Sequence, residues 1–453
     1  MIRQNFNADW TVEKGDGNSR MNSFLGNTQT KTVHLPYDAM IHEARTPDTK
    51  NGAQTGFYPG GEYIFQKHFT APQAWQGKPV SLVFEGVYQT ALVYLNGWLL
   101  TRNVNGYAEF TVEAGPYLKY GADNLLKVIA DNSLEPNSRW YTGSGIYRPV
   151  RLLVGNKVYL PQDTVRITTR EAGEGFALLD VTAQVQSAST VTERVTLQQT
   201  ICREGTAVLT DRQNLLLRPG ESRTVSFRYC VDSPALWSPE DPNLYTSTLQ
   251  VLEGEEELDR EETSFGIRTL SIDAAHGVRI NGQTVKLRGA CIHHDNGILG
   301  AATLPDAEER RIRQLKEAGF NAIRSSHHPA GRALLDACDR YGVLVMDELS
   351  DVWNLRKNPY DYALYFEQDW KQTIQKMVAK DYNHPSVILY CVGNEISEAG
   401  SESGAETNRR LCNTFRELDP TRYTTNALNG LMAAGYRLRE IMGDVMRKFP
   451  AQP

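Results

Sequence analysis

The chain has 453 residues, of which 40% are hydrophobic and 23% are charged, so we expect a soluble protein of more than one domain. Its 48 basic and 54 acidic side chains give a formal net charge of −6. Because the sequence shows neither a global excess nor a local run of basic residues, we expect no nucleic-acid partner and no anionic membrane partner.

The N-terminus, "MIRQNFNADWTVEKGDG", is polar and mixed in charge, and it lacks the apolar core of a signal peptide. No later stretch is apolar over the length that crosses a bilayer. The six cysteines form no CxxC pair. Four of them fall within apolar strand-like or helix-like patterns: Cys291, Cys338, Cys391 and Cys412. We therefore expect free, buried thiols and a cytoplasmic protein.

Residues 1–157 contain short strand-like segments and turns without a long amphipathic helix. "EYIFQKHF" and "NLLKVIADN" have the pattern of strands, and "ALVYLNGWLL" places Asn96-Gly97 between two apolar arms. An Asn-Gly pair in this setting is a strong signal for a β-hairpin. This segment is therefore predicted to be a β-sandwich.

Residues 158–269 are predicted to form a second β-sandwich. Val181, Ala183 and Val185 alternate with polar residues, and the same alternation recurs in three later segments, the last of which ends at Val251. A period of two marks strands with one buried face. Strands spaced in this way over about a hundred residues are typical of an immunoglobulin-like sandwich.

From residue 270 to residue 453 strand-like and helix-like segments alternate. "PDAEERRIRQLKEAG" is predicted to be a helix whose apolar stripe is Ile312, Leu315 and Ala318. Gly319 is expected to end it. Alternation of this kind, with apolar strands, indicates a parallel sheet covered by helices.

The polar residues decide between a doubly wound sheet and a barrel. Polar pairs end four successive strands: His293-His294, His327-His328, Asp347-Glu348 and Asn394-Glu395. A doubly wound sheet gathers its site mainly at one switch point, whereas a closed barrel gathers side chains from every strand end. We therefore predict an incomplete (β/α)8 TIM barrel with about five of its eight strands.

Glu395 is the strongest candidate for a catalytic side chain, because it follows the buried run "VILYCVG" at the barrel rim. A partly desolvated carboxyl group there can stay protonated and act as an acid. Asp347-Glu348 is expected to be a hydrogen-bonded or ion-paired support, and Arg324 either its buried partner or a residue that steers a polar substrate. In each histidine pair only one side chain can readily face the barrel axis.

A metal-dependent hydrolase barrel is the rival interpretation of histidine and carboxylate side chains at strand ends. The first strand offers the adjacent pair His293-His294, not the His-x-His spacing that places two ligands on one side. No later strand supplies a further obvious pair of ligands. Metal catalysis is therefore the less favoured of the two.

Several motifs in one consistent order resemble glycoside hydrolase family 2, which includes β-galactosidases, β-glucuronidases and β-mannosidases. Three motifs resemble the two sandwich domains of the family: "SRWYTGSGIYRPVRL" (138–152), "LWSPEDPNLY" (236–245) and "FGIRT" (265–269). Four more resemble its first barrel strands: "LRGACIHHDNGILGA", "FNAIRSSHHP", "RYGVLVMDELSDVW" and "NHPSVILYCVGNEIS". The resemblance implies a sugar-binding-like, jelly-roll-like sandwich, an immunoglobulin-like sandwich and a TIM barrel.

The resemblance also implies a retaining, exo-acting β-glycosidase that hydrolyses a terminal β-linked sugar, with a β-galactoside as the favoured substrate. Glu395 matches the general acid/base of the family, and Asn394 matches the residue that binds the sugar beside the reacting centre. Arg324 and His327 match second-strand positions that line the pocket.

Two further positions carry weaker correspondences to the sugar pocket of the family. On the first barrel strand either His293 or Asp295 matches a pocket residue. Asp131 matches a position where the first sandwich of some members reaches the sugar, and the alternative is a turn residue after the strand "LLKVIA".

The nucleophile of the family is a glutamate on the seventh barrel strand, and retention requires two carboxyl groups roughly 5 Å apart. Nothing in 431–453 reads as that strand, and Glu440 lies on an apparent helix. We therefore expect the chain to be a C-terminally truncated enzyme that is inactive by itself. An open barrel should expose apolar surface and associate, so a homo-oligomer is a possible state.

Some β-galactosidases of the family bind Mg²⁺ beside the acid/base, and Mg²⁺ or Na⁺ would follow here by analogy. Val352 and Asn354 stand near the positions of the ligating glutamate and histidine, so no cofactor is expected, although Asp351 could substitute. A different class of function also stays open, in which the chain binds carbohydrate or a complementing partner without catalysis.

Overall fold

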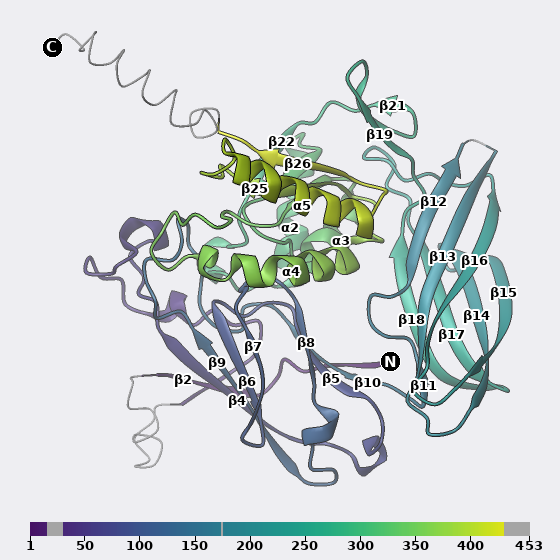
Figure 1. Ribbon diagram of the computed structural model, residues 1–453, viewed down its shortest axis with the longest axis horizontal. Helices are drawn as coiled ribbons and strands as arrows, with labels where there is room; N and C mark the ends of the chain where they lie inside the picture. Colours follow the sequence, from purple (N-terminus) through teal and green to yellow (C-terminus); the bar gives the residue numbers. More distant parts are fainter. Residues whose placement is uncertain (16–29, 174, 430–453) are drawn as a thin grey trace.

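The structure is a computed structural model that describes residues 1–15, 30–173 and 175–429. Two β-sandwiches are followed along the chain by a parallel sheet with its helices (Figure 1). The prediction of two sandwiches and the first part of a barrel is confirmed. The segment 431–453, with Glu440, lies outside the described residues. No helix in the described ranges is both long enough and apolar enough to cross a membrane.

The first sandwich consists of two antiparallel sheets. The larger has the order β3-β2-β4-β9-β6-β7, with β2 Trp10–Lys14, β3 Lys31–Val33, β4 Glu62–Thr70, β6 Thr90–Leu95, β7 Trp98–Asn103 and β9 Asp123–Asp131. The smaller has the order β1-β10-β5-β8, with β1 Ile2–Asn5, β5 Val80–Phe84, β8 Phe110–Glu113 and β10 Val150–Val154. The predicted hairpin joins β6 to β7, and Asn96 and Gly97 have the positive φ values, 52° and 90°, that a type I′ turn requires.

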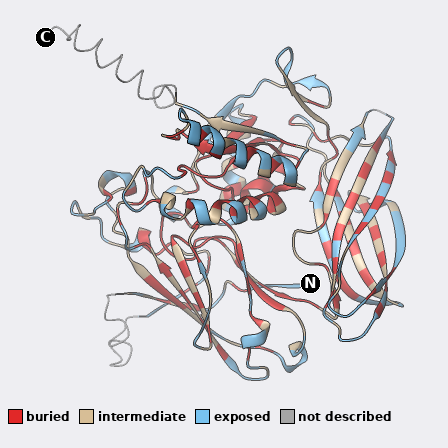
Figure 2. Ribbon diagram, viewed as in Figure 1, coloured by how far each residue is buried: buried red, intermediate tan, exposed pale blue. Residues whose placement is uncertain are grey.

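The second sandwich also has two antiparallel sheets. One contains β11 Val158–Tyr159, β12 Arg166–Ala172, β13 Phe176–Ser187 and β16 Ser222–Asp232. The other has the order β15-β14-β17-β18, with β14 Glu193–Arg203, β15 Thr206–Leu217, β17 Tyr245–Glu253 and β18 Glu256–Phe265. Figure 2 shows buried and exposed residues alternating along several of these strands. The period of two in the sequence therefore reports strands with one face in the core.

A small antiparallel sheet leads into the barrel, with β19 Leu270–Asp273, β20 Gly277–Ile280 and β21 Gln283–Thr284. The barrel sheet is parallel throughout, with β22 Gly289–Ile292, β23 Ala322–Ser325, β24 Leu344–Glu348, β25 Val387–Asn394 and β26 Tyr423–Ala427. One helix connects each strand to the next: α2 Pro305–Glu317, α3 Arg332–Tyr341, α4 Phe366–Asp381 and α5 Glu402–Leu418. Because all five strands run the same way, their carboxyl ends share one edge.

Helix α2 follows the sequence prediction closely. Pro305 opens it, and Ile312 is fully buried in the barrel core. Gly319, just beyond its end, has φ of 88°, which a residue without a Cβ adopts at little cost.

Three of the four cysteines that were predicted to be buried are buried: Cys338, Cys391 and Cys412. The prediction is wrong for Cys291, which is exposed. Cys291 lines an apolar hollow of about 250 Å³ on the barrel sheet, together with Ile323 and Met346, and the hollow leaves its thiol accessible. An apolar strand pattern shows that a residue lies in a sheet, but it does not show what covers each face.

The first sandwich contacts the carboxyl end of the barrel strands. The His328 ring stacks on the Tyr107 ring with 3.9 Å between their centroids, and His294 Nε2 lies 2.9 Å from the Thr142 carbonyl oxygen. His294 and His328 are buried, and both follow strand ends. The first sandwich therefore reaches the edge of the sheet where the polar pairs lie.

The second sandwich contacts the opposite end of the barrel strands. Trp237 is fully buried, and its indole N–H donates to the Asp339 carbonyl oxygen at 2.9 Å. The Arg268 guanidinium donates to the carbonyl oxygens of Pro385 and Val387 at 2.6 and 2.8 Å. Because Val387 begins β25, this contact lies at the amino end of the sheet.

Candidate active site at the barrel rim

Glu348, at the end of β24, organises the rim. It is fully buried, and it accepts hydrogen bonds from Arg324 Nε at 2.8 Å and Arg324 Nη2 at 3.0 Å. His327 Nδ1 lies 2.7 Å from the Glu348 Oε1 atom. A buried carboxylate is tolerated when it is paired and hydrogen-bonded in this way. Glu348 therefore serves as the support that was predicted for this strand end, and Arg324, whose side chain is 19% exposed, is its partner.

Asn394, the last residue of β25, connects this support to a second cluster of charges. Its Oδ1 atom accepts a hydrogen bond from Arg324 Nη2 at 2.7 Å, and its Nδ2 donates to Asp351 Oδ1 at 2.8 Å. Only 4% of the residue is exposed. Because these two bonds fix the amide on both sides, its orientation is determined by the protein.

Glu395 follows directly and has a different environment. Its side chain is 38% exposed, and its backbone has φ of 45°, in the left-handed region that residues with a Cβ rarely adopt. Its N–H donates to the Ala427 carbonyl oxygen of β26 at 2.7 Å. Its Oε1 accepts from Asn429 Nδ2 at 3.2 Å, and Arg139 Nη1 lies 3.8 Å from its Oε2. The backbone thus leaves the strand abruptly and presents a carboxylate at the rim.

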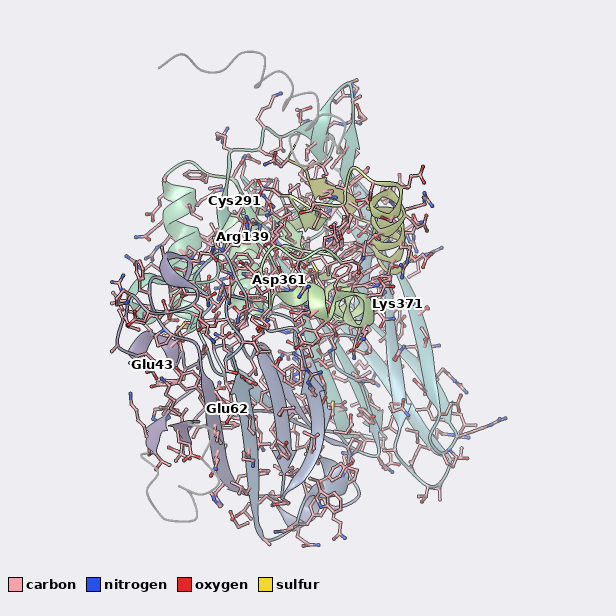
Figure 3. All side chains as sticks on the ribbon, turned by 60° about the vertical axis from the view of Figure 1, so that its left-hand side comes forward. Glu43, Glu62, Arg139, Cys291, Asp361 and Lys371 are labelled. Atoms are coloured by element: carbon pink, nitrogen blue, oxygen red, sulfur yellow. The ribbon has the colours of Figure 1, made fainter. Side chains whose placement is uncertain are left out.

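Arg139 comes from the first sandwich, and our sequence analysis did not identify it. It donates to both oxygens of Asp351, at 2.7 and 3.2 Å, and Lys357 Nζ lies 2.9 Å from Asp351 Oδ1. Figure 3 labels Arg139 close to Asp361, where the first sandwich meets the barrel. The signal that could have identified it is the motif "SRWY", which was noted only as a family resemblance.

Two pKa shifts follow from this arrangement. Burial alone would raise the pKa of the Asp351 carboxyl group, but hydrogen bonds from Arg139 and Asn394 and the charge of Lys357 hold it below its ordinary value. Burial lowers the pKa of Lys357, although the Asp351 carboxylate opposes that shift. The cluster therefore stays charged because its members are paired.

The histidine pairs divide as expected. The His293 and His327 rings meet edge to face, with centroids 5.3 Å apart and an angle of 82° between their planes. The Trp140 ring lies 5.4 Å from the His293 ring and 5.3 Å from the His327 ring. Burial, together with the neighbouring His327, lowers the pKa of His293. His294 and His328 turn instead into the contact with the first sandwich. Trp140 is a second rim residue that sequence reasoning missed.

Two of the residues suggested by the resemblance are not joined to this cluster. Asp131, at the end of β9, accepts hydrogen bonds from the Ser133 N–H at 3.0 Å and the Ser133 hydroxyl at 2.6 Å. The Asp295 carbonyl oxygen accepts from Arg311. Within residues 1–15, 30–173 and 175–429, no hydrogen bond connects either carboxylate to Asn394 or Glu395. A role for them in sugar binding stays a prediction.

The residues at the rim do not fit a Mg²⁺ site. The Asp351 carboxylate, which could stand in as a ligand, already accepts from Arg139, Lys357 and Asn394, and two of these are cations. Among the described residues, the one group with metal-like spacing is Asp336, Asp339 and His384. It lies at the amino end of the sheet, where Asp339 also accepts the Ser386 N–H.

Sequence models of three domains of one enzyme family match the chain in order. The model of a "Glycosyl hydrolase 2 galactose-binding domain-like" domain matches 10–172, that of "Glycosyl hydrolases family 2" matches 158–268, and that of the "Glycosyl hydrolases family 2, TIM barrel domain" matches 274–446. Together they follow the two sandwiches and the barrel strands described above.

Individual relatives agree with this assignment. A β-galactosidase of Bacteroides ovatus is 37% identical over 89% of this chain and 48% of its own length, and a putative β-glucuronidase of Formosa agariphila is 31% identical over 94% and 40%. A solved structure of a glycosyl hydrolase family 2 member from Bacteroides cellulosilyticus superposes with a TM-score of 0.91 at 34% identity, over 99% of this chain and 60% of that one. The chain spans about half the length of the curated relatives it matches. It belongs to glycosyl hydrolase family 2.

Proposed function

We propose that the protein is a retaining, exo-acting β-glycosidase, that Glu395 is its general acid/base, and that a β-galactoside is the first substrate class to test. One observation carries the proposal: an accessible carboxylate at the barrel rim follows an amide that the protein holds on both sides. The relatives named β-galactosidase and β-glucuronidase support the reaction class and leave two sugars to compare.

In this mechanism Glu395 protonates the departing glycosidic oxygen while a second carboxylate attacks the anomeric carbon, and Glu395 then takes a proton from the water that releases the sugar. An amide nitrogen has two N–H donors. Asn394 directs one of them to Asp351, and we propose that it directs the other to a sugar hydroxyl. We propose that His327 offers Nε2 to the sugar, because Glu348 holds its Nδ1.

The attacking carboxylate is not supplied by the described cluster. Glu348 is fully buried between Arg324 and His327, and Asp351 is held by Arg139 and Lys357. Neither is free to form a covalent bond to a sugar. We therefore propose that a residue outside these 453 residues provides the nucleophile and that the 453 residues alone do not turn over β-glycosides.

A comparison of two proteins tests the proposal. One is the 453-residue chain, and the other is the same chain joined to the part of the Bacteroides ovatus relative that follows the matched region. Hydrolysis of 4-nitrophenyl β-galactoside and β-glucuronide is measured for both. We expect turnover only in the joined protein, and a loss of ~10²–10⁴-fold in kcat for Glu395→Gln.

Glu402→Gln is the matched control, because Glu402 is an exposed glutamate at the start of α5. It should leave kcat unchanged. Equal turnover by Glu395→Gln and the unaltered joined protein would contradict the assignment of the acid/base. If the 453-residue chain alone hydrolyses either substrate, and Glu395→Gln abolishes this turnover, the nucleophile is not supplied from outside the chain and the proposal is contradicted.

A further inference from the structure

We propose that Arg139 of the first sandwich is a positioning residue for Glu395, acting through Asp351 and Lys357 on the end of β25. The inference rests on the proposed role of Glu395 as the acid/base. It assigns the first sandwich a direct part in the active site, at a position 212 residues away from Asp351 in the sequence.

Two hydrogen bonds in series link Arg139 to Asn394. Arg139 donates hydrogen bonds to both carboxylate oxygens of Asp351. Asp351 Oδ1 also accepts a hydrogen bond from Asn394 Nδ2 at 2.8 Å. The Asp351 side chain is only 10% exposed. A two-point contact between a guanidinium and a largely buried carboxylate fixes direction as well as distance. The angle of the Asn394 amide is therefore set partly from the first sandwich.

Lys357 holds the backbone beside Glu395. Its Nζ donates to the Asn394 carbonyl oxygen at 2.6 Å, to the Asp351 carbonyl oxygen at 2.7 Å and to Asp351 Oδ1 at 2.9 Å. These three bonds use all three N–H groups of the ammonium, and its side chain is 8% exposed. The Asn394 carbonyl belongs to the peptide group that joins Asn394 to Glu395, so Lys357 restrains the plane from which Glu395 projects.

Glu395 needs such restraint because its backbone is strained. A φ of 45° for a residue with a Cβ persists only where the surroundings hold it. The peptide group that precedes Glu395 is held at both of its polar atoms, because its N–H donates to the Ala427 carbonyl oxygen and its carbonyl oxygen accepts from Lys357 in the network from Arg139. Removal of Arg139 should let the end of β25 relax.

Arg139 also lies beside the Glu395 side chain. The distance of 3.8 Å between Arg139 Nη1 and Glu395 Oε2 is too long for a hydrogen bond. The link from Arg139 to Glu395 therefore runs through Asp351 and Lys357 to the peptide group, and not through a direct bond between the two side chains.

The alternative is that Arg139 only joins two domains. The chain offers a matched case in Arg3, which donates to both oxygens of Glu261 and joins the first sandwich to the second. The exposed fractions of the two pairs are nearly the same, 36% and 8% for Arg3 and Glu261, and 34% and 10% for Arg139 and Asp351. Arg3→Met therefore removes a domain contact of the same kind without touching the rim.

The test measures hydrogen exchange of peptides that cover residues 387–398 in the 453-residue chain. For Arg139→Met we expect exchange there to accelerate by ~10-fold or more relative to the unaltered chain, because a charge-assisted contact that holds this segment is lost. For Arg3→Met we expect no change in these peptides. Equal protection in Arg139→Met and the unaltered chain, or equal acceleration in both variants, would overturn the proposal.

A second measurement separates positioning from general loss of stability. The urea midpoints of Arg139→Met and Arg3→Met are compared, and we expect similar values because the two ion pairs have nearly the same exposure. Faster exchange of residues 387–398 in Arg139→Met alone then has a local cause, and Arg139→Lys, which keeps a cation beside Asp351, should restore part of the protection. Exchange in this segment that follows the urea midpoint in both variants, or no restoration in Arg139→Lys, would contradict the inference. Neither measurement uses turnover, so an inactive joined protein would count against the proposed function alone.

Discussion

The two ends of the barrel sheet are joined to the sandwiches by different kinds of contact. At the amino end Trp237 packs in one apolar cluster with Ala322, Leu344 and Ile388, which lie in three of the barrel strands. At the carboxyl end the contact is made by aromatic rings, histidines and the ion pair of Arg139 with Asp351. The contact with the sandwich is mainly apolar at the first end, and at the second end it is made by polar and ionisable side chains.

This difference teaches how one sheet can be both rigid and reactive. Apolar burial at the amino end contributes stability in proportion to area and is insensitive to pH. Polar groups at the carboxyl end hold the accessible carboxylate of Glu395 in place, and barrels of this class place their chemistry at that end. The second sandwich therefore acts as a support, while the first shares the site.

Trp237→Ala should have the largest effect and tests the amino end. The side chain is fully buried, and removal of a buried tryptophan typically costs ~3–5 kcal/mol. We expect a marked fall in the urea midpoint, with hydrogen exchange of peptides from 387–398 changing no more than that of the rest of the barrel. Trp140→Ala, at the half-buried rim position, is the control and should cost less. A larger loss of stability in Trp140→Ala than in Trp237→Ala would contradict the view that the amino end supports the barrel while the carboxyl end forms the site.

Acidification should weaken the carboxyl end. Burial lowers the pKa of His294 to about 3, against an ordinary value of 6.5, so the ring is neutral in the folded protein while the unfolded chain takes up a proton below pH 6.5. Stability therefore falls as the pH drops from 6.5 toward 3, and at about pH 5 this group alone costs ~2 kcal/mol. His294→Gln should lose less stability between about pH 7 and pH 5 when thermal unfolding is followed.

His34→Gln is the control for acidification, because His34 is exposed and follows β3 in the first sandwich. It should keep the pH dependence of the unaltered chain. If His294→Gln shows that same dependence, the buried rim histidine does not set the acid limit. His328 should act in the same direction, since burial holds its pKa well below the ordinary value.

The sequence predicts the elements much better than it predicts the contacts between them. The spacing of apolar residues follows from the local geometry of a strand or a helix, so the strands and α2 could be located from the sequence. The strand-end position of Glu395 followed from the apolar run that precedes it. The pairing of Arg139 with Asp351 could not be derived, because 212 residues separate them and no periodicity links the two. Cys291 was misjudged for a related reason, since a strand pattern does not show which face is covered.

At the amino end the pH dependence should have the opposite sign. Burial would lower the pKa of His384, but the Asp339 carboxylate, 2.6 Å from its Nδ1, raises it above 6.5 overall. The stabilisation is present in full below pH 6.5 and is lost as the pH rises through the folded-state value. His384→Gln should therefore flatten the alkaline decline of the urea midpoint and leave the acid side unchanged. A steeper acid decline in this variant would contradict the sign. We expect a smaller effect than at His294, because Asp339 keeps its bond to Ser386.

Tyr107→Phe should have the smallest effect on stability and tests whether a rim contact also shapes the site. The variant loses the hydroxyl that accepts the Trp140 indole N–H at 3.0 Å, at a cost of ~1 kcal/mol, and keeps the ring that stacks on His328. Tyr147→Phe is matched, because that buried hydroxyl donates to the Gly106 carbonyl oxygen, also at 3.0 Å, away from Trp140. Both should lower the unfolding midpoint by similar amounts, but only Tyr107→Phe should alter galactose or glucuronate binding in calorimetry. If the two variants change sugar binding equally, the bond between Tyr107 and Trp140 does not orient the Trp140 ring for binding. The contact between the first sandwich and the barrel would then influence the rim through stability alone.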